Sequence, residues 1–261
     1  MDSAVDIPGN LALVEERIQA AARRVGRDPD EVTLVAVTKT YPIEVMQAGY
    51  QAGIRHFGEN RVEEGREKIP AFNQWLAAGR EASPQPTWHM IGHLQRRKAA
   101  DVLAVFDMIH SVDSLRLAER LNRLAERDAG QAAGDQPPMP ILLECNVSGE
   151  ASKYGFELTQ WADDREARAA FYDAVRRIAE LPRLQLQGLM TMAPIVADPE
   201  QARPIFVALR ALRDGLVEEF PSVKWRHLSM GMTDDFEVAI EEGATMVRIG
   251  RAIFGPRACE I

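Results

Sequence analysis

The chain has 261 residues, and its 31 basic and 39 acidic side chains give a net charge of −8 at pH 7. This acidic balance argues against a general binder of nucleic acid or of anionic membranes. The N-terminus lacks the basic and apolar regions of a signal peptide, and no apolar run approaches the roughly 18 residues that a membrane span needs. We therefore expect a cytoplasmic protein with no nucleic-acid and no membrane partner.

The two cysteines, Cys145 and Cys259, are far apart and form no CxxC pair. Neither a disulfide framework nor a zinc site is indicated, and we expect no bound metal. Cys145 lies in an apolar run and is predicted to be a small core residue.

The first elements in chain order place one lysine at the end of a buried strand. Apolar residues at helical spacing predict an amphipathic helix over residues 10–24. Residues 33–40 are predicted to form a strand, because their β-branched and apolar run is typical of a parallel strand that is covered on both faces. Lys39 lies near the end of this strand, before a predicted helix over 43–52. Since α/β folds place their chemistry at the carboxyl ends of strands, Lys39 is a candidate functional residue.

Lys39 has two interpretations. Desolvation disfavours the ammonium ion and lowers its pKa, which produces a nucleophilic amine that can form a Schiff base with a carbonyl compound. Alternatively, the side chain extends to the rim of the domain and pairs with a carboxylate. The strand alone does not decide between them.

Further strands follow at regular intervals, nearly all separated by helical patterns. They are predicted over residues 54–60, 87–92, 106–112, 140–147, 184–192, 223–230 and 245–250. Eight strands alternating with helices predict a single (β/α)8 TIM barrel, with the barrel proper over about 31–257 of one domain that covers 1–261, and with the N-terminal helix as an addition. The absence of Gly-x-Gly-x-x-Gly after the first strand weakens the doubly wound alternative.

Polar residues recur where these strands end. Asn60 ends the second strand, before a predicted helix over 61–69, and so repeats the position of Lys39. His89 lies near the end of the third strand, where a histidine more often makes a structural hydrogen bond than acts as a ligand or base.

The loops after the last two strands are rich in small residues. Barrels frequently hold a phosphate in these loops through backbone N–H groups, and segments 229–233 and 250–255 have suitable residues. Glycines also end many strands for backbone reasons alone. Together with Lys39, the two loops favour a ligand that carries both an aldehyde and a phosphate.

Arg248 adds a clue about the ligand. By strand alternation it points into the barrel near the upper rim, where a guanidinium needs an acceptor. A pyridine nitrogen is such an acceptor, and an arginine there keeps that nitrogen unprotonated. The alternative is an ion pair with Glu144 or Glu237.

Seven ordered motifs resemble the pyridoxal phosphate homeostasis proteins, the YggS/PROSC family, over about residues 10–256. The motifs are Val37-Thr-Lys-Thr40, Phe57-Gly-Glu-Asn60, Trp88-His-Met-Ile-Gly92, Ser152-Lys-Tyr-Gly155, Gly188-Leu-Met190, Leu228-Ser-Met-Gly-Met232, and Met246-Val-Arg-Ile-Gly250 with Ala252-Ile-Phe-Gly255. The chain departs from the family pattern around the third βα loop, at His93 and Arg96-Arg97.

The resemblance implies a barrel like the N-terminal domain of alanine racemase, with pyridoxal 5'-phosphate as cofactor. It implies that Lys39 forms the Schiff base, that Asn60 lies near the ring and that Arg248 lies at the pyridine nitrogen. It also implies that Ser229, Gly231 and Gly250 surround the phosphate. Lys153 matches a lysine that takes up cofactor secondarily.

We therefore expect a monomeric carrier of pyridoxal phosphate that serves intracellular homeostasis of this cofactor, without robust turnover, without catalytic residues and with apo forms of pyridoxal phosphate enzymes as candidate partners. One alternative is a pyridoxal phosphate-dependent amino-acid racemase, although relatives of that kind carry a further β domain for which this chain leaves no room. Another is a Schiff-base aldolase acting on a sugar phosphate, which shares the lysine and the phosphate site and does not need Arg248.

Overall fold

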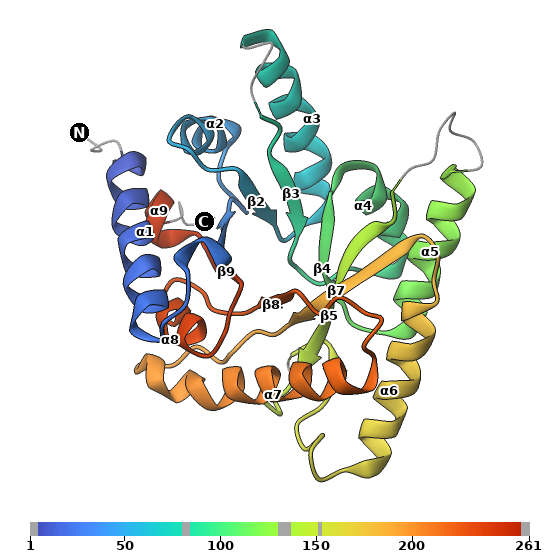
Figure 1. The fold of residues 1–261 in the computed structure, drawn as a ribbon. Helices are drawn as coiled ribbons and strands as arrows, with labels where there is room; N and C mark the ends of the chain where they lie inside the picture. The colour runs from blue at the N-terminus through green and yellow to red at the C-terminus, as the bar shows by residue number, and fades with distance from the viewer. Residues whose placement is uncertain (1–4, 80–83, 130–136, 151–152, 257–261) are drawn as a thin grey trace.

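The computed structural model describes residues 5–79, 84–129, 137–150 and 153–256. Eight parallel strands form a ring in the order β4-β3-β2-β1-β9-β8-β7-β5, and pairing of β4 with β5 closes it (Figure 1). This confirms the predicted (β/α)8 barrel. The strands are β1 Thr33–Val37, β2 His56–Glu59, β3 Thr87–Met90, β4 Met108–Val112, β5 Met139–Asn146, β7 Leu184–Met190, β8 His227–Ser229 and β9 Met246–Ile249.

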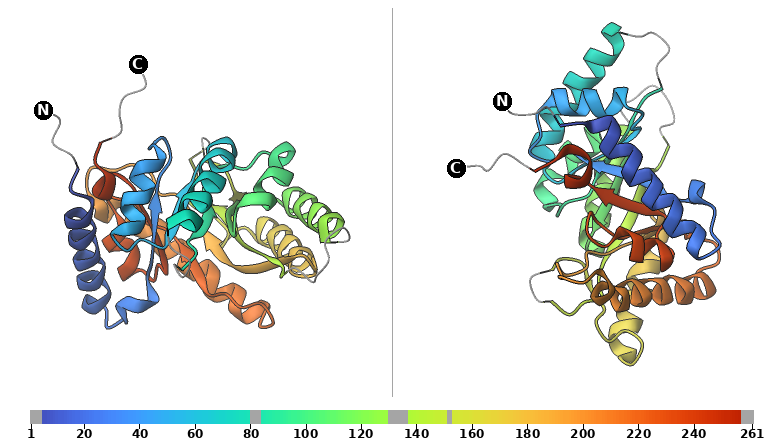
Figure 2. Two further views of the ribbon diagram at one scale, coloured as in Figure 1. Left: turned by 90° about the horizontal axis from the view of Figure 1, so that it is seen from above. Right: turned by 90° about the vertical axis from the view of Figure 1, so that its left-hand side faces the viewer.

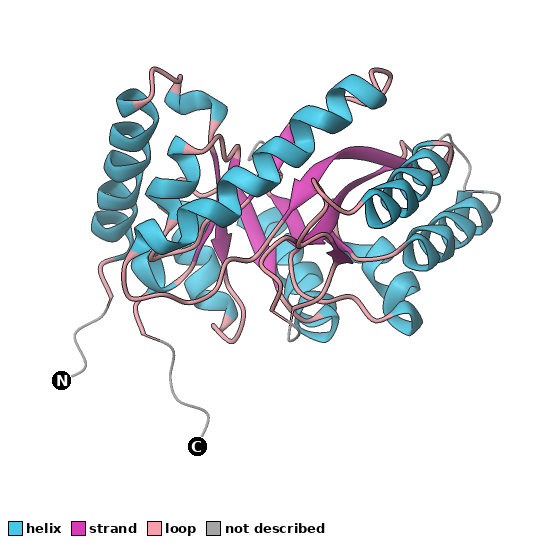
Figure 3. Ribbon diagram, turned by 90° about the horizontal axis from the view of Figure 1, so that it is seen from below, coloured by secondary structure: helices cyan, strands magenta, loops and turns pink. Residues whose placement is uncertain are grey.

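Helices surround this ring, as the view from below makes clear (Figure 3). They are α1 Ile7–Arg24, α2 Ile43–Gln51, α3 Val62–Gly79, α4 Ala99–Val105, α5 Leu115–Ala129, α6 Arg165–Ala179, α7 Arg203–Glu219, α8 Phe236–Glu241 and α9 Arg251–Phe254. Their apolar faces and the outer faces of the strands form one large core. Within the described residues, no helix combines the length and the apolar character that crossing a membrane requires.

The additional N-terminal helix packs on the outside of the barrel, against the helices that flank its last strand. The apolar stripe of α1, with Leu11, Val14 and Ile18, is buried. The helix lies beside α8 and α9, and the Asn10 side chain donates a hydrogen bond to the Ile253 carbonyl at 3.0 Å (Figure 2). Helix α1 therefore belongs to the barrel domain.

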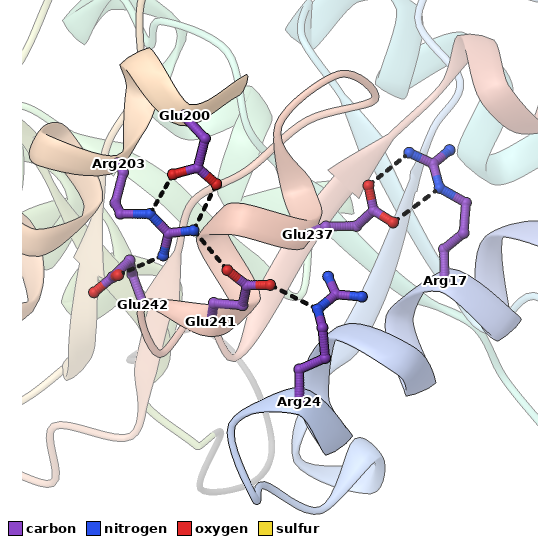
Figure 4. A network of polar contacts seen from close by, with 7 residues as sticks. All are labelled: Arg17, Arg24, Glu200, Arg203, Glu237, Glu241 and Glu242. Atoms are coloured by element: carbon purple, nitrogen blue, oxygen red, sulfur yellow. Dashed lines mark hydrogen bonds and ion pairs between the residues drawn. The ribbon is translucent and has the colours of Figure 1, made fainter. Parts of the chain in front are cut away.

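A network of ion pairs orients these outer helices (Figure 4). Arg17 and Arg24 of α1 pair with Glu237 and Glu241 of α8 at 3.0 and 2.8 Å. The Arg203 guanidinium bridges three carboxylates, those of Glu200, Glu241 and Glu242, at 2.6 to 2.7 Å. Because single exposed pairs contribute little, apolar packing holds α1 and the network sets its orientation.

Some elements differ from the prediction. Strand β1 ends at Val37 rather than at residue 40, because Thr40 has a φ of +66° and ends the extended backbone. A short strand that was not predicted, β6 Phe156–Glu157, pairs with the end of β5.

The barrel interior is unusually polar. Its apolar layer consists of Met108, Leu142, Met190 and Met246. The buried polar side chains on the inward faces of the strands include those of His89, His110, Glu144, Ser229 and Arg248. Branched apolar residues usually fill such barrels, so these buried polar groups call for a functional explanation.

Candidate functional site

A cavity of about 410 Å³ lies at the carboxyl ends of the strands. Four of the six predicted site residues line it: Lys39 after β1, Asn60 after β2, Arg248 in β9 and Gly250 after β9. Ser229 and Gly231 are not among its lining residues. The remaining wall is formed by Val37, Ile91, Met192, Ile195, Met232, Thr233, Asp234 and Arg251.

The backbone around Lys39 is held by α3. On one side, Lys68 Nζ donates a hydrogen bond to the Thr38 carbonyl at 3.0 Å. On the other, the Thr40 N–H donates to Glu64 Oε2 at 2.8 Å, and Lys68 also pairs with Glu64 at 3.0 Å. These contacts fix the two peptide groups next to Lys39 and hold Thr40 in its left-handed conformation.

Glu59 completes this arrangement at the end of β2. Its Oε1 atom accepts hydrogen bonds from Thr38 Oγ1 at 2.8 Å and from Lys68 Nζ at 3.2 Å. Burial raises the pKa of the Glu59 carboxyl, and the neighbouring Lys68 opposes that rise. Sequence reasoning missed Lys68, although its spacing of four residues from Glu64 was a signal for a helical ion pair.

Asn60 lines the cavity and carries an unsatisfied buried acceptor. Its Oδ1 atom is buried and has no hydrogen-bond partner within the part of the chain that the structure describes. Gly92, which follows β3, packs directly on the Asn60 backbone, so that a Cβ atom at Gly92 would lie 2.2 Å from the Asn60 carbonyl oxygen. The absence of a side chain at Gly92 thus sets the position of Asn60.

We expect the Gly92→Ala substitution to destabilise the fold and to displace Asn60. The added methyl group overlaps backbone atoms that cannot rotate away, so the free energy of unfolding should fall by about 2 kcal/mol. Denaturant unfolding measures this loss. Gly79→Ala is a matched control, because nothing lies within 4 Å of a Cβ atom there; equal effects at both positions would contradict the packing argument.

Arg248 is buried in the barrel and reaches the cavity. Its Nη1 atom donates to Ser229 Oγ at 2.6 Å and its Nη2 atom donates to the Thr191 carbonyl at 2.9 Å. Burial lowers the pKa of Arg248 to about 10, so the guanidinium remains charged at neutral pH. The predicted alternative of an ion pair with Glu237 is wrong, because Glu237 pairs with Arg17.

The three residues predicted around the phosphate occupy different environments. The Ser229 hydroxyl lies under the cavity, between Arg248 at 2.6 Å and His110 Nδ1 at 2.9 Å. Gly231 has a φ of +91°, and a Cβ atom there would lie 2.6 Å from Ala239 Cβ, so the loop needs glycine to pack on α8. Gly250 lies in the cavity wall directly before α9.

Several lining residues were not predicted individually. Thr233 and Asp234 belong to the loop after β8, and Arg251 follows Gly250 directly and pairs with Asp234 at 2.6 Å. Ile195, in the loop after β7, lies at the rim and is 90% exposed. The two predicted loop segments contain Thr233 and Arg251, whereas Asp234 and Ile195 lie outside them.

The comparisons with known proteins concern the whole chain. Residues 10–258 match the family model described as the alanine racemase N-terminal domain. The pyridoxal phosphate homeostasis protein of Escherichia coli K12 is 44% identical over 256 residues, which covers 97% of this chain and 97% of that protein. This chain belongs to the pyridoxal phosphate homeostasis protein family.

Solved structures agree with this assignment. PipY of Synechococcus elongatus, whose structure was determined with PLP bound, is 31% identical, with a TM-score of 0.73 over 96% of this chain and 100% of that chain. An alanine racemase of Clostridium difficile has a TM-score of 0.66 at 13% identity and covers 94% of this chain and 60% of that chain, which shows the shared fold alone.

The family motifs do not all lie at the cavity. The motifs that contain Lys39, Asn60, Arg248 and Gly250 each contribute a residue to the wall. In the Ser152-Lys-Tyr-Gly155 motif, Ser152 lies outside the described residues, and Lys153 pairs with Glu150 at 3.5 Å and is not part of the cavity lining.

Glu144 is a further buried ionisable group near Arg248, and its Oε2 atom has no hydrogen-bond partner within the described ranges. Burial, reinforced by the nearby Asp113, raises the pKa of Glu144 to about 7 in spite of Arg248 and Lys153. Arg248 donates its hydrogen bonds to Ser229 and Thr191, and these contacts do not favour the predicted alternative of an ion pair with Glu144.

We expect Glu144→Gln to stabilise the protein at alkaline pH. A carboxyl whose pKa is raised by folding imposes no penalty below its unfolded pKa, and the penalty grows as pH rises toward the folded value of about 7. The gain should be about 2 to 3 kcal/mol at pH 8 and should vanish near pH 4.5. Chemical denaturation at both pH values tests this, with exposed Glu16→Gln as control; a gain that does not depend on pH would contradict the assigned pKa.

Proposed function

We propose that this protein binds pyridoxal phosphate in the cavity between Lys39 and Arg248, holds it as a Schiff base on Lys39, and serves homeostasis of the cofactor in the cytoplasm. The observation that carries the proposal is the convergence in one cavity of an amine side chain, a buried guanidinium and an asparagine whose amide oxygen has no hydrogen-bond partner among the described residues. A relative of similar fold, PipY, was solved with PLP bound. A cavity of about 410 Å³ suits a small phosphorylated ligand.

The residues present suit the groups of this cofactor. Bound there, pyridoxal phosphate supplies an aldehyde that condenses with an amine. Lys39 is the amine in our proposal, Asn60 lies beside the ring and Arg248 donates toward the pyridine nitrogen. The main chain at Gly250, with Ser229 and Gly231 as further predicted residues, receives the phosphate.

The charge of Arg248 supports storage of the cofactor over turnover. A guanidinium only donates hydrogen bonds, so a ring nitrogen facing it stays unprotonated. This weakens the withdrawal of electrons on which most reactions of the cofactor depend. We propose that a monomer holds the reactive aldehyde and transfers it to apo forms of pyridoxal phosphate enzymes.

Titration of the purified protein with pyridoxal phosphate tests the proposal. We expect a yellow complex with a Schiff-base absorption band, in a one-to-one ratio. A colourless protein that borohydride traps only with a sugar phosphate would favour an aldolase. Racemisation of alanine at enzyme-like rates, roughly 1 s⁻¹ or faster, would favour the alternative of an amino-acid racemase.

A further inference from the structure

Four of the five histidines of this chain gather inside the barrel, on four different strands. Three of them form a row in which each ring bonds the next. His56 Nδ1 lies 3.0 Å from His89 Nε2, and His89 Nδ1 lies 2.9 Å from His110 Nε2. His110 Nδ1 then lies 2.9 Å from Ser229 Oγ. His89 and His110 are buried, and His56 is half-buried.

This row connects two opposite ends of the molecule. At one end, Ser229 accepts a hydrogen bond from Arg248, which lines the cofactor cavity. At the other end, His56 lines a second cavity of about 420 Å³, formed by the amino-terminal ends of β1 and β2 and by α1. The histidine row therefore runs along the interior between the two cavities.

The direction of every hydrogen bond in the row follows from Arg248. An arginine can only donate, so Ser229 Oγ accepts from it. The Ser229 hydroxyl hydrogen then needs an acceptor in a buried site, and His110 Nδ1 is the acceptor within reach. His110 must consequently carry its hydrogen on Nε2 and donate to His89, and His89 in turn donates from Nε2 to His56 Nδ1.

The rings in the middle of the row stay neutral at physiological pH. Burial lowers the pKa of His89 to about 3, and burial together with His89 and Arg248 lowers the pKa of His110 well below its usual value. Ring nitrogens face each other within hydrogen-bond distance, and the described residues include no group of His, Cys, Asp and Glu side chains suited to a metal ion. The row is thus a chain of neutral hydrogen bonds.

We propose that Ser229, His110, His89 and His56 form a one-directional hydrogen-bond relay that positions the Arg248 guanidinium in the cofactor cavity and responds to a proton bound at His56. The relay depends on the proposed function in one respect only, namely that pyridoxal phosphate is the ligand that Arg248 contacts. The three histidines act on the ligand only through Ser229 and Arg248 and are positioning residues.

Proton binding at His56 is incompatible with these hydrogen-bond directions. A protonated His56 carries hydrogen on Nδ1, which then faces the donor Nε2 of His89, so the row must switch tautomers or break. If it switches, His110 Nδ1 becomes a donor toward Ser229, and the buried hydroxyl hydrogen has no acceptor. The titratable and charged groups near His56 are His89, His110 and His227 within the barrel, and Arg55, Glu15 and Asp30 along the second cavity.

Nuclear magnetic resonance of protein labelled with ¹⁵N-histidine tests the relay without any cofactor. At neutral pH we expect His56, His89 and His110 to carry hydrogen on Nε2 alone. Ser229→Ala removes the hydroxyl donor, so His110 should lose this single tautomer, whereas His93→Gln, at the one histidine outside the barrel interior, should change nothing. A His89 or His110 ring with hydrogen on Nδ1 in the unaltered protein would overturn the proposal.

The His56→Gln substitution tests whether proton uptake at His56 causes the tautomer change, without removing the hydrogen bond that His89 donates. The glutamine amide oxygen can accept the hydrogen bond of His89, but it does not take up a proton. Burial lowers the pKa of His56, so the titration is carried to acidic pH until His56 takes up its proton. At that point we expect His89 and His110 to change tautomer in the unaltered protein and to keep it in His56→Gln. Equal behaviour of the two proteins would contradict the role of His56.

The absorption of the protein mixed with pyridoxal phosphate distinguishes the two proposals. We expect the band to change with pH in the unaltered protein and in His93→Gln, and to lose this change in His56→Gln. If the histidines carry hydrogen on Nε2 as expected but the protein shows no Schiff-base band with pyridoxal phosphate, the proposed function is refuted and the relay stands. A band with the opposite tautomers would refute the relay alone.

Discussion

Lys39→Ala is expected to abolish the Schiff-base absorption band completely while the protein remains folded. The substitution removes the amine that lies in the cavity, and the backbone contacts of Thr38 and Thr40 with α3 do not involve the lost side chain. Absorption after addition of pyridoxal phosphate measures the band, and far-ultraviolet circular dichroism measures the fold. The aldehyde should then be found free or only weakly held by the remaining contacts.

Lys153→Ala is the matched control for this experiment. Lys153 is also partly buried, and it pairs with Glu150 away from the cavity lining. The control should keep the full band. If the Lys39→Ala protein retained the band and the Lys153→Ala protein lost it, the cofactor would be attached to Lys153, which would contradict the proposal.

Arg248→Glu is expected to shift the absorption band and to weaken binding. A carboxyl at this position can accept a hydrogen bond from a ring nitrogen, so that nitrogen becomes protonated and the electronic spectrum of the bound cofactor changes. The substitution also removes the donors to Ser229 and Thr191, and truncating a buried charged hydrogen bond costs about 1.5 to 3 kcal/mol. Arg248→Gln, which keeps a donor without the charge, shows whether loss of stability alone explains the result.

Arg251→Glu makes the same charge change in the wall of the same cavity. The Arg251 side chain is 57% exposed and its guanidinium pairs with Asp234, so we do not expect it to contact the ring nitrogen. We expect its band to keep the position seen in the unaltered protein. An unchanged band in folded Arg248→Glu would place Arg248 away from the pyridine nitrogen.

The fold could be predicted because each barrel strand is a local signal. Apolar runs separated by helical patterns gave eight strands, and parallel order followed from their alternation with helices. Strand ends were less predictable, since residues 38–40 continue the β-branched composition of β1 while Thr40 turns to positive φ. Helix α3 also continues to Gly79 through Pro70, beyond the predicted end at residue 69, because its buried face with Phe72 and Leu76 stabilises the continuation.

The site was predicted where one residue type at a strand end was sufficient. Lys39, Asn60, Arg248 and Gly250 were found in this way, and the structure brings all four to one cavity. The contacts that position them could not be predicted, because they join residues far apart in the chain. The contact of His110 with Ser229, for example, joins β4 to β8 through the barrel interior, and only the three-dimensional arrangement of the strands reveals it.

Mass spectrometry of the protein after reduction with borohydride in the presence of pyridoxal phosphate tests the central claim most directly. Reduction makes the bond between amine and cofactor permanent, so a peptide digest identifies the modified lysine. Our account predicts modification of Lys39 at about one equivalent, unchanged in the Lys153→Ala protein. Modification of Lys153 or of other lysines with Lys39 unmodified would contradict it.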